Sequence, residues 1–280
     1  MDLGGLDTRV VEMEGEGQPI LFLHGFADSA DTWRPTMAAL ASSGRAAAAI
    51  DLAGFGAGSP PLTEIDLLPQ WDGMVADAIR TLSAHHDGAE VFVAGNSLGG
   101  CLAIRAAQEA TLPLAGVVPI APAGLHMARW FPVIESQRLI RLLARSPLPI
   151  PELVVREFVG RVYASLAFAD PGRANPSHIA SFTRHIPNIA RGNEILELGR
   201  RLLPELEDPF DLEAIDRPLL LVWGESDRMV YTTGAERVLR TVPYADIEIL
   251  PDCGHCPQLE VPERLAEMLL GFPEEFEHAG

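Results

Sequence analysis

One stretch decides the fold of this chain: Val91-Phe92-Val93-Ala94-Gly95-Asn96-Ser97-Leu98-Gly99-Gly100. It begins as an apolar run typical of a buried strand and continues, after Gly99, into a helical pattern. A G-x-S-x-G motif between a strand and a helix is typical of a nucleophile elbow, where glycines leave room for a sharp turn. Such a turn holds the serine in a strained conformation with its hydroxyl pushed out of the sheet edge. We therefore predict that Ser97 is a nucleophile.

Short apolar runs and amphipathic segments alternate on both sides of this stretch. The predicted strands are Pro19–His24, Arg45–Asp51, Glu90–Ala94, Leu114–Ile120, Pro218–Trp223 and Asp246–Leu250. The predicted helices are Thr32–Ser43, Gln70–His85, Leu98–Ala110, Thr233–Thr241 and Pro262–Phe272. This alternation predicts an α/β fold with a mainly parallel central sheet and helices on both of its faces.

The alternation breaks between about residue 125 and about residue 209. Helical patterns there, including Arg138–Leu143 and Val154–Ala164, are divided by prolines. We predict a core domain of residues 1–124 and 210–280, with a helical cap of residues 125–209 inserted between two core strands. Most aromatic residues of the cap should pack between helices and a minority should line a pocket; they are Trp130, Phe131, Phe158, Tyr163, Phe168 and Phe182.

A serine hydroxyl is a poor nucleophile at neutral pH and needs a base that is itself oriented. His255 follows the predicted strand Asp246–Leu250, and Asp227 follows the strand that ends at Trp223. Loops that leave the same ends of parallel strands share one edge of the sheet, so these side chains can converge on Ser97. The chain order serine, aspartate, histidine is also typical of a sheet with this kind of elbow.

Two other carboxylates compete with Asp227 for the role of orienting the histidine. Asp252 is only three residues from His255 and is too local, whereas Glu225 lies closer to the strand end. We prefer Asp227 and keep Glu225 as the alternative.

A tetrahedral intermediate also needs hydrogen-bond donors for its negative oxygen. One backbone N–H should come from Leu98, the residue after the nucleophile. The second should come from Phe26, because Gly25 allows a tight turn directly after the strand Pro19–His24.

Taken together, these motifs resemble those of cap-bearing α/β-hydrolases over nearly the whole chain. The matching residues are His24-Gly25-Phe26, Asp51-Leu52-Ala53-Gly54-Phe55-Gly56 with Ser59, Gly95-Asn96-Ser97-Leu98-Gly99-Gly100, Gly224-Glu225-Ser226-Asp227 and Gly254-His255-Cys256-Pro257. The resemblance implies a triad of Ser97, Asp227 and His255 and an oxyanion hole at Phe26 and Leu98. Related dehalogenases and epoxide hydrolases have an aspartate at the elbow, so a serine disfavours their chemistry.

Three functions are compatible with this pattern. The preferred one is a serine hydrolase that cleaves a small or medium carboxylic ester with an apolar part, through an acyl-enzyme intermediate. The alternative is a carbon–carbon bond hydrolase of vinylogous diketo acids, which Asn96 and the stretch 121–125 resemble. Cys256 and the stretch Phe26-Ala27-Asp28 depart from that group. A third possibility is a non-catalytic ligand-binding protein with the same fold.

Charge and composition exclude several partners. The chain has 21 basic and 39 acidic residues, a net charge of −18 that opposes binding to nucleic acid. Residues 1–10 have neither a basic start nor an apolar core, so we expect no secretory signal. Prolines interrupt Leu112–Ala128, the most apolar long stretch, so we also expect no membrane span. The expected partner is a small molecule, and the oligomeric state is left open.

The three cysteines, Cys101, Cys253 and Cys256, suit a reducing cytoplasm, where we expect the protein to be located. Cys253 and Cys256 have C-x-x-C spacing, but their position near the end of a long chain disfavours a thioredoxin-like redox role. A second pair that could complete a metal site is lacking in the sequence nearby. We therefore expect neither a metal nor an organic cofactor.

Overall fold

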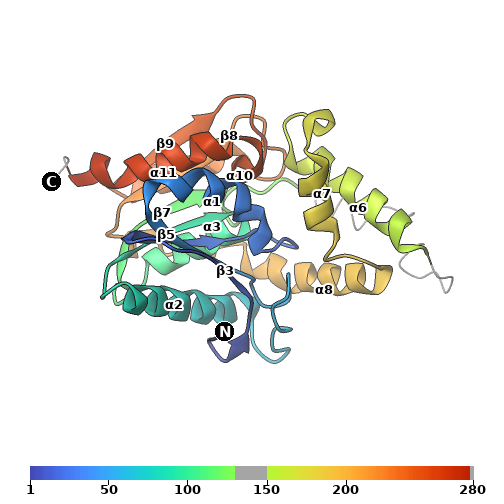
Figure 1. Ribbon diagram of the computed structural model, residues 1–280, viewed down its shortest axis with the longest axis horizontal. Helices are drawn as coiled ribbons and strands as arrows, with labels where there is room; N and C mark the ends of the chain where they lie inside the picture. The colour runs from blue at the N-terminus through green and yellow to red at the C-terminus, as the bar shows by residue number, and fades with distance from the viewer. Residues whose placement is uncertain (130–149, 278–280) are drawn as a thin grey trace.

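The computed structural model describes residues 1–129 and 150–277 and is built around a seven-stranded sheet (Figure 1). The strand order is β3-β5-β4-β6-β7-β8-β9; β3 runs antiparallel to β5, and the other neighbouring pairs are parallel. The strands are β3 (Val10–Met13), β4 (Gly17–Leu23), β5 (Arg45–Ile50), β6 (Val91–Asn96), β7 (Leu114–Ile120), β8 (Leu219–Gly224) and β9 (Ala245–Leu250). The predicted α/β fold with a mainly parallel sheet is confirmed.

Two features at the N-terminus were not predicted. The strands β1 (Asp2–Leu3) and β2 (Leu6–Asp7) form a small antiparallel hairpin, and β3 adds the antiparallel edge strand to the main sheet. None of the four residues of β3 is fully buried, so the strand lacks the continuous apolar run by which the other strands were recognised.

Helices cover both faces of the sheet because its strands are apolar on both faces. Ile20 and Phe22 of β4 face one side, with α1 (Arg34–Leu40) and α11 (Pro262–Glu277). Leu21 and Leu23 face the other side, where α2 (Leu67–His85), α3 (Leu98–Ala107) and α9 (Ala235–Thr241) pack. The shorter helices are α10 (Pro257–Glu260) and the 3₁₀ turns Ala30–Trp33, Ala41–Ser43, Pro171–Arg173, Leu212–Ala214 and Thr232–Gly234.

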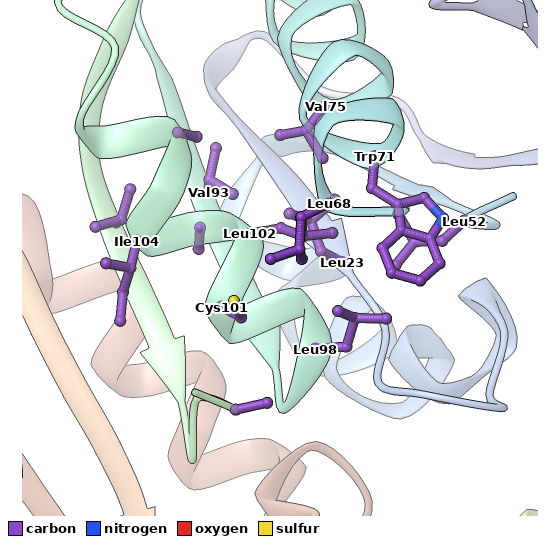
Figure 2. Packing of buried hydrophobic residues seen from close by; sticks show 14 of the residues in the cluster. Leu23, Leu52, Leu68, Trp71, Val75, Val93, Leu98, Cys101, Leu102 and Ile104 are labelled. Carbon is purple, nitrogen blue, oxygen red and sulfur yellow. The ribbon is translucent and has the colours of Figure 1, made fainter. Parts of the chain in front are cut away.

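The packing of α3 determines where Ser97 lies. Figure 2 shows Leu98, Cys101 and Leu102 of α3 among buried side chains of α2 and the strands. Trp71 of α2 is fully buried beside them, and its indole N–H donates a hydrogen bond to the Ala53 carbonyl at 3.0 Å. The first turn of α3 is therefore held rigidly against the core, and Ser97 directly precedes it.

Between β7 and β8, the described residues form the helices of an inserted cap. Its described helices are α6 (Glu152–Ala167), α7 (Pro176–Thr183) and α8 (Ile189–Glu205), which gather at one end of the molecule (Figure 1, right). The two ends of the insertion meet, because a Cβ added to Gly124 would collide with the Pro209 ring. The division of the chain at residues 125 and 209 stays a prediction. The predicted helix Arg138–Leu143, Trp130 and Phe131 lie outside the described residues.

The cap is tied to the core at its second end. The Glu205 carboxylate at the end of α8 accepts hydrogen bonds from the Leu67 and Leu68 N–H groups at 2.9 and 2.8 Å. These donors belong to the first turn of α2, where intrahelical partners are lacking and a negative charge is favourable. Within residues 1–129 and 150–277, no helix is long and apolar enough to cross a membrane.

Candidate active site

Ser97 occupies a strained turn between β6 and α3. Its backbone has φ 54° and ψ −109°, a region that side chains rarely adopt. A Cβ on Gly95 would collide with the Gly99 carbonyl, and one on Gly99 would collide with the Leu23 carbonyl. Only glycine fits at these two positions, so the sequence motif specifies the elbow that was predicted.

Asp227 and His255 meet at the ends of β8 and β9. His255 Nδ1 lies 2.8 Å from Asp227 Oδ2, and both side chains are almost completely buried. The other oxygen of Asp227 accepts hydrogen bonds from the Met229 and Val230 N–H groups at 2.7 and 3.0 Å. This arrangement fixes the carboxylate, which in turn orients the imidazole with its Nδ1–H toward the acid.

The structure places the three acids considered for this role in different surroundings. Glu225 and Asp252 are both exposed, whereas Asp227 is buried against the imidazole. The sequence alone left Glu225 open because it is nearer to the end of β8; the chain needs two more residues to turn the carboxylate inward.

Ser97 and His255 border the same cavity of about 470 Å³. Within the described part of the chain, His255 Nε2 is buried and has no hydrogen-bond partner. The cavity extends from these residues toward the cap and is lined mainly by apolar side chains of α6, α7 and α8. His255 and Ser97 therefore border one space that can hold an apolar small molecule.

The cap aromatics contribute more to this cavity than expected. Phe158, Tyr163 and Phe182 border it, so the expectation that only a minority would line a pocket is wrong for the described members. Tyr163 and Phe182 also stack on each other with ring centroids 3.8 Å apart, and Phe168 is buried beside Tyr163. The same side chains therefore both pack between helices and line the cavity.

A buried chain of amide groups supports the histidine loop. Asn96 Nδ2 donates to the His255 carbonyl at 2.8 Å, and Gln258 Nε2 donates to Asn96 Oδ1 at 3.1 Å. Gln258 was not singled out in the sequence, and nothing there except its position three residues after His255 could have indicated this role. Asn96 was noted only for its resemblance to carbon–carbon bond hydrolases; here it fixes the loop that carries the histidine.

The residues at the end of α6 are hydrogen-bonded to the same histidine loop. The Glu260 carboxylate accepts from the Gly254 N–H at 2.8 Å and from the Ala169 N–H at 2.9 Å, and burial raises the pKa of this carboxyl. The His255 N–H donates to the Ala167 carbonyl at 2.8 Å. The guanidinium of Arg228, next to Asp227, donates to the carbonyls of residues 165, 168 and 169. The cap and the Asp227 and His255 loops therefore form one hydrogen-bonded unit.

The predicted oxyanion-hole residues lie beside Ser97. A Cβ on Gly25 would stand 3.4 Å from the Ser97 Cβ, so the turn after β4 closely approaches the elbow. Phe26 and Leu98 border, together with Ser97, a small recess of about 30 Å³. That their N–H groups bind an oxyanion stays a prediction.

His24 fixes the turn that leads to Phe26. Its Nε2 accepts a hydrogen bond from the Leu52 N–H at 2.9 Å, and its Nδ1 lies 2.7 Å from the Gly25 carbonyl. These partners define a neutral imidazole protonated at Nδ1. Complete burial lowers the pKa of His24 to about 4, which keeps the ring in this form.

The C-x-x-C cysteines are buried thiols with different neighbours. Cys253 Sγ lies 3.8 Å from Glu260 Oε1, and Cys256 Sγ lies 3.7 Å from the Tyr163 hydroxyl. Burial raises the pKa of both thiols, which disfavours the reactive thiolate. Among the residues that the structure describes, no group of three or more His, Cys, Asp or Glu side chains could hold a metal ion.

A parallel sheet with a serine elbow at one strand end and a carboxylate–histidine pair at two others defines the α/β-hydrolase class. Residues 20–268 match the model of the alpha/beta hydrolase family, and this chain belongs to that family.

Three relatives differ in their reactions. The chain is 27% identical over 277 residues to a dihydrolipoyllysine-residue acetyltransferase component of an acetoin cleaving system from Pseudomonas putida (97% of this chain, 68% of the relative). It is 25% identical over 260 residues to a pimeloyl-acyl carrier protein methyl ester esterase from Nitrosomonas europaea (91% and 95%). It is also 25% identical over 279 residues to a 2-hydroxy-6-oxo-6-(2'-aminophenyl)hexa-2,4-dienoic acid hydrolase from Metapseudomonas resinovorans (97% and 89%).

Proposed function

We propose that the protein is a serine hydrolase that cleaves a small or medium carboxylic ester through an acyl-enzyme intermediate. The observation that supports this function is the hydrogen bond between His255 Nδ1 and Asp227 Oδ2, in a histidine that borders the same cavity as Ser97 and whose Nε2 has no partner among the described residues. A buried imidazole whose outer nitrogen has no protein partner is suited to exchange protons with a hydroxyl and a leaving group.

The reaction has two halves. Ser97 Oγ attacks the ester carbonyl carbon while His255 Nε2 accepts its proton, and the carbonyl oxygen gains the negative charge. The Phe26 and Leu98 N–H groups stabilise that charge. The imidazolium then protonates the leaving alcohol as the carbon–oxygen bond breaks. In the second half His255 activates a water that releases the acid from Ser97. The Asp227 carboxylate stabilises each imidazolium.

The ester assignment has two supports. The cavity next to Ser97 is lined mainly by apolar side chains and has the size of a small-molecule site. A methyl ester esterase is among the relatives over nearly the full length of both chains. We infer from both that an apolar ester is the substrate.

The second candidate is cleavage of a carbon–carbon bond in a vinylogous diketo acid. The dienoic acid hydrolase among the relatives and the Asn96 next to the nucleophile favour it. Cys256 and the stretch 26–28 depart from that group. We rank it second.

An active-site-directed fluorophosphonate tests whether the protein is a serine hydrolase. We expect it to label the wild type and not Ser97→Ala. Loss of labelling in the variant with an unchanged melting temperature would assign the label to Ser97. If neither protein is labelled, a ligand-binding protein of the same fold becomes the better explanation.

A pair of substrates separates the two reactions. We expect turnover of 4-nitrophenyl acyl esters, and little or no cleavage of a coloured 2-hydroxy-6-oxo-dienoate. Turnover of the dienoate alone would reverse the ranking. Ser97→Ala serves as the control for both substrates, because spontaneous hydrolysis of an activated ester is not enzymatic.

A further inference from the structure

Asp28 is a carboxylic acid in the wall of the cavity. It follows the predicted oxyanion residue Phe26 by two positions, in a turn where the Asp28 N–H donates to the Gly25 carbonyl and Ala27 has φ 63°. Asp28 is 7% exposed and borders the same space as Ser97 and His255. The catalytic proposal makes no use of this carboxyl.

Asp28 shares the cavity wall with two other polar side chains. The Tyr163 hydroxyl from α6 and the Cys256 thiol beside His255 both interact electrostatically with it. These two groups lie 3.7 Å apart, and each borders the cavity. The carboxyl therefore sits at a polar spot in an otherwise mainly apolar space, between the oxyanion turn and the histidine loop.

Few donors stabilise a negative charge on Asp28. The Ser29 N–H donates to Oδ1 at 2.9 Å, and the Thr32 hydroxyl is a second partner. The carboxylates of Asp31 and Asp51 also oppose its ionisation. Complete burial, with a smaller contribution from these two carboxylates, raises the pKa of Asp28 to about 7, so Asp28 is charged in mildly alkaline solution.

We propose that Asp28 is a specificity-determining residue that admits uncharged esters to the cavity and rejects esters that carry a carboxylate. The inference rests on the proposed function and names its substrate class. A second carboxylate in this space would be desolvated and repelled by Asp28. At an effective dielectric constant of about 20, like charges about 7 Å apart weaken binding about 50-fold. The dienoic acid in the name of one relative is an example of a substrate with such a carboxylate.

Two methyl esters of the same shape test the proposal. Monomethyl succinate carries a carboxylate where methyl 4-methylpentanoate carries an isopropyl group. Their kcat/KM values are measured from released methanol at about pH 6 and about pH 8.5, where the succinate ester is ionised throughout. Any effect of pH on the reaction steps that both esters share cancels in the ratio of their kcat/KM values.

We expect the preference for the uncharged ester to grow at least about fivefold between these pH values in the wild type, because Asp28 ionises there. In Asp28→Asn the preference at the higher pH should fall at least about tenfold and lose its pH dependence. Asn keeps an oxygen for the Ser29 N–H, so the turn is retained. The exposed Asp66→Asn also removes one carboxylate and should behave as wild type.

The other titratable groups around Asp28 are not expected to produce this change of ester preference with pH. Burial raises the pKa of Tyr163 and of Cys256, so both stay protonated across the range, and the pKa of Asp31 and of Asp51 is lowered, so both stay charged. The wild-type profile is informative even if the variant does not fold.

The outcomes separate the two proposals. A ratio that is independent of pH in the wild type, or equal in wild type and Asp28→Asn, overturns the role of Asp28 while ester hydrolysis stands. A wild type that hydrolyses neither ester and is not labelled by a fluorophosphonate overturns both, because there is then no ester site for Asp28 to select.

Discussion

Asp227 divides its two carboxylate oxygens between two tasks. Oδ1 is held by two backbone N–H groups, and Oδ2 is left for His255 Nδ1. The carboxylate is therefore held in place by the protein alone. The imidazole cannot rotate Nδ1 away from Asp227 without breaking its hydrogen bond to Oδ2.

Replacing Asp227 by Asn should disable the proposed catalysis with little effect on the fold. The Asn oxygen can take the two backbone bonds, and its amide then faces Nδ1 as a donor, which favours the wrong tautomer of His255. We expect kcat for 4-nitrophenyl butyrate to fall on the order of 10³ to 10⁴-fold, with KM changed little. Glu225→Gln is the matched control, since Glu225 is exposed, and it should retain activity within about twofold. A Glu225 variant as defective as the Asp227 variant would contradict the assignment.

The candidate triad could be predicted because each of its members lies in the first few residues after a strand, at the same edge of the sheet. Asp28, Gln258 and Glu260 could not, because their roles depend on burial and on contacts between segments far apart in the chain. Asp28 stood in the sequence only as a departure from the carbon–carbon bond hydrolases. Its position in the cavity wall, which it shares with Tyr163 of the cap, is known only from the structure.

At the scale of elements, the meeting of β4, β6 and α3 leaves no room for a side chain at Gly99. The atoms that an added Cβ would meet are backbone atoms of Leu23, which cannot move without shifting β4. Gly99→Ala should therefore lower the free energy of unfolding by about 3 kcal/mol and abolish labelling of Ser97.

Gly73→Ala is the control for that change, because Gly73 lies inside α2 with open space where a Cβ would stand. Alanine is the better helix former, so this variant should gain about 0.5 to 1 kcal/mol. Urea denaturation measures both values. Equal stability of wild type and Gly99→Ala would show that the elbow is less tightly packed than described.

Glu260 joins two elements, the exit of α6 and the histidine loop. In Glu260→Gln one of the two N–H groups that it binds, at Gly254 or Ala169, meets an amide donor and loses its partner. We expect a loss of about 1 to 3 kcal/mol in stability and a fall of about tenfold in kcat. The exposed Glu263→Gln should change neither quantity. A variant that loses stability and keeps full kcat would limit Glu260 to a structural role.

The elements that were predicted correctly share strong periodicity and terminal signals. The helix Gln70–His85 was predicted three residues short of its start at Leu67, because Glu205 of the cap, far away in sequence, supplies the partners for that first turn. β3 escaped prediction because it is short and partly exposed. Tertiary contacts, which sequence patterns do not contain, decide such boundaries.

At the scale of the whole molecule, two neighbouring buried groups give stability opposite dependences on pH. The pKa of His24 is lowered from 6.5 to about 4, so its contribution is lost as the pH falls through this range. The pKa of Asp28 is raised from 3.8 to about 7, so the native state holds a proton that the unfolded chain has released, and stability is lost as the pH rises through that range. The two slopes largely cancel between about pH 4 and 6.5.

Asp28→Asn should uncover the slope that His24 contributes. We expect the stability of the variant relative to wild type to increase by about 2 to 3 kcal/mol between about pH 5 and pH 8, measured by urea denaturation. The variant alone should lose stability as the solution is acidified below about pH 6.5. Parallel pH profiles for variant and wild type would show that Asp28 ionises as readily in the native state as in the unfolded one.

The contact between Gly124 and Pro209 has a consequence for how such a molecule can diversify. A segment that departs and returns at one point can be exchanged as a single continuous piece of the gene, while the strands on either side keep their register. Selection can thus alter which compounds are accepted, provided that the new piece keeps the backbone groups of residues 165–169 that bind the histidine loop and Arg228.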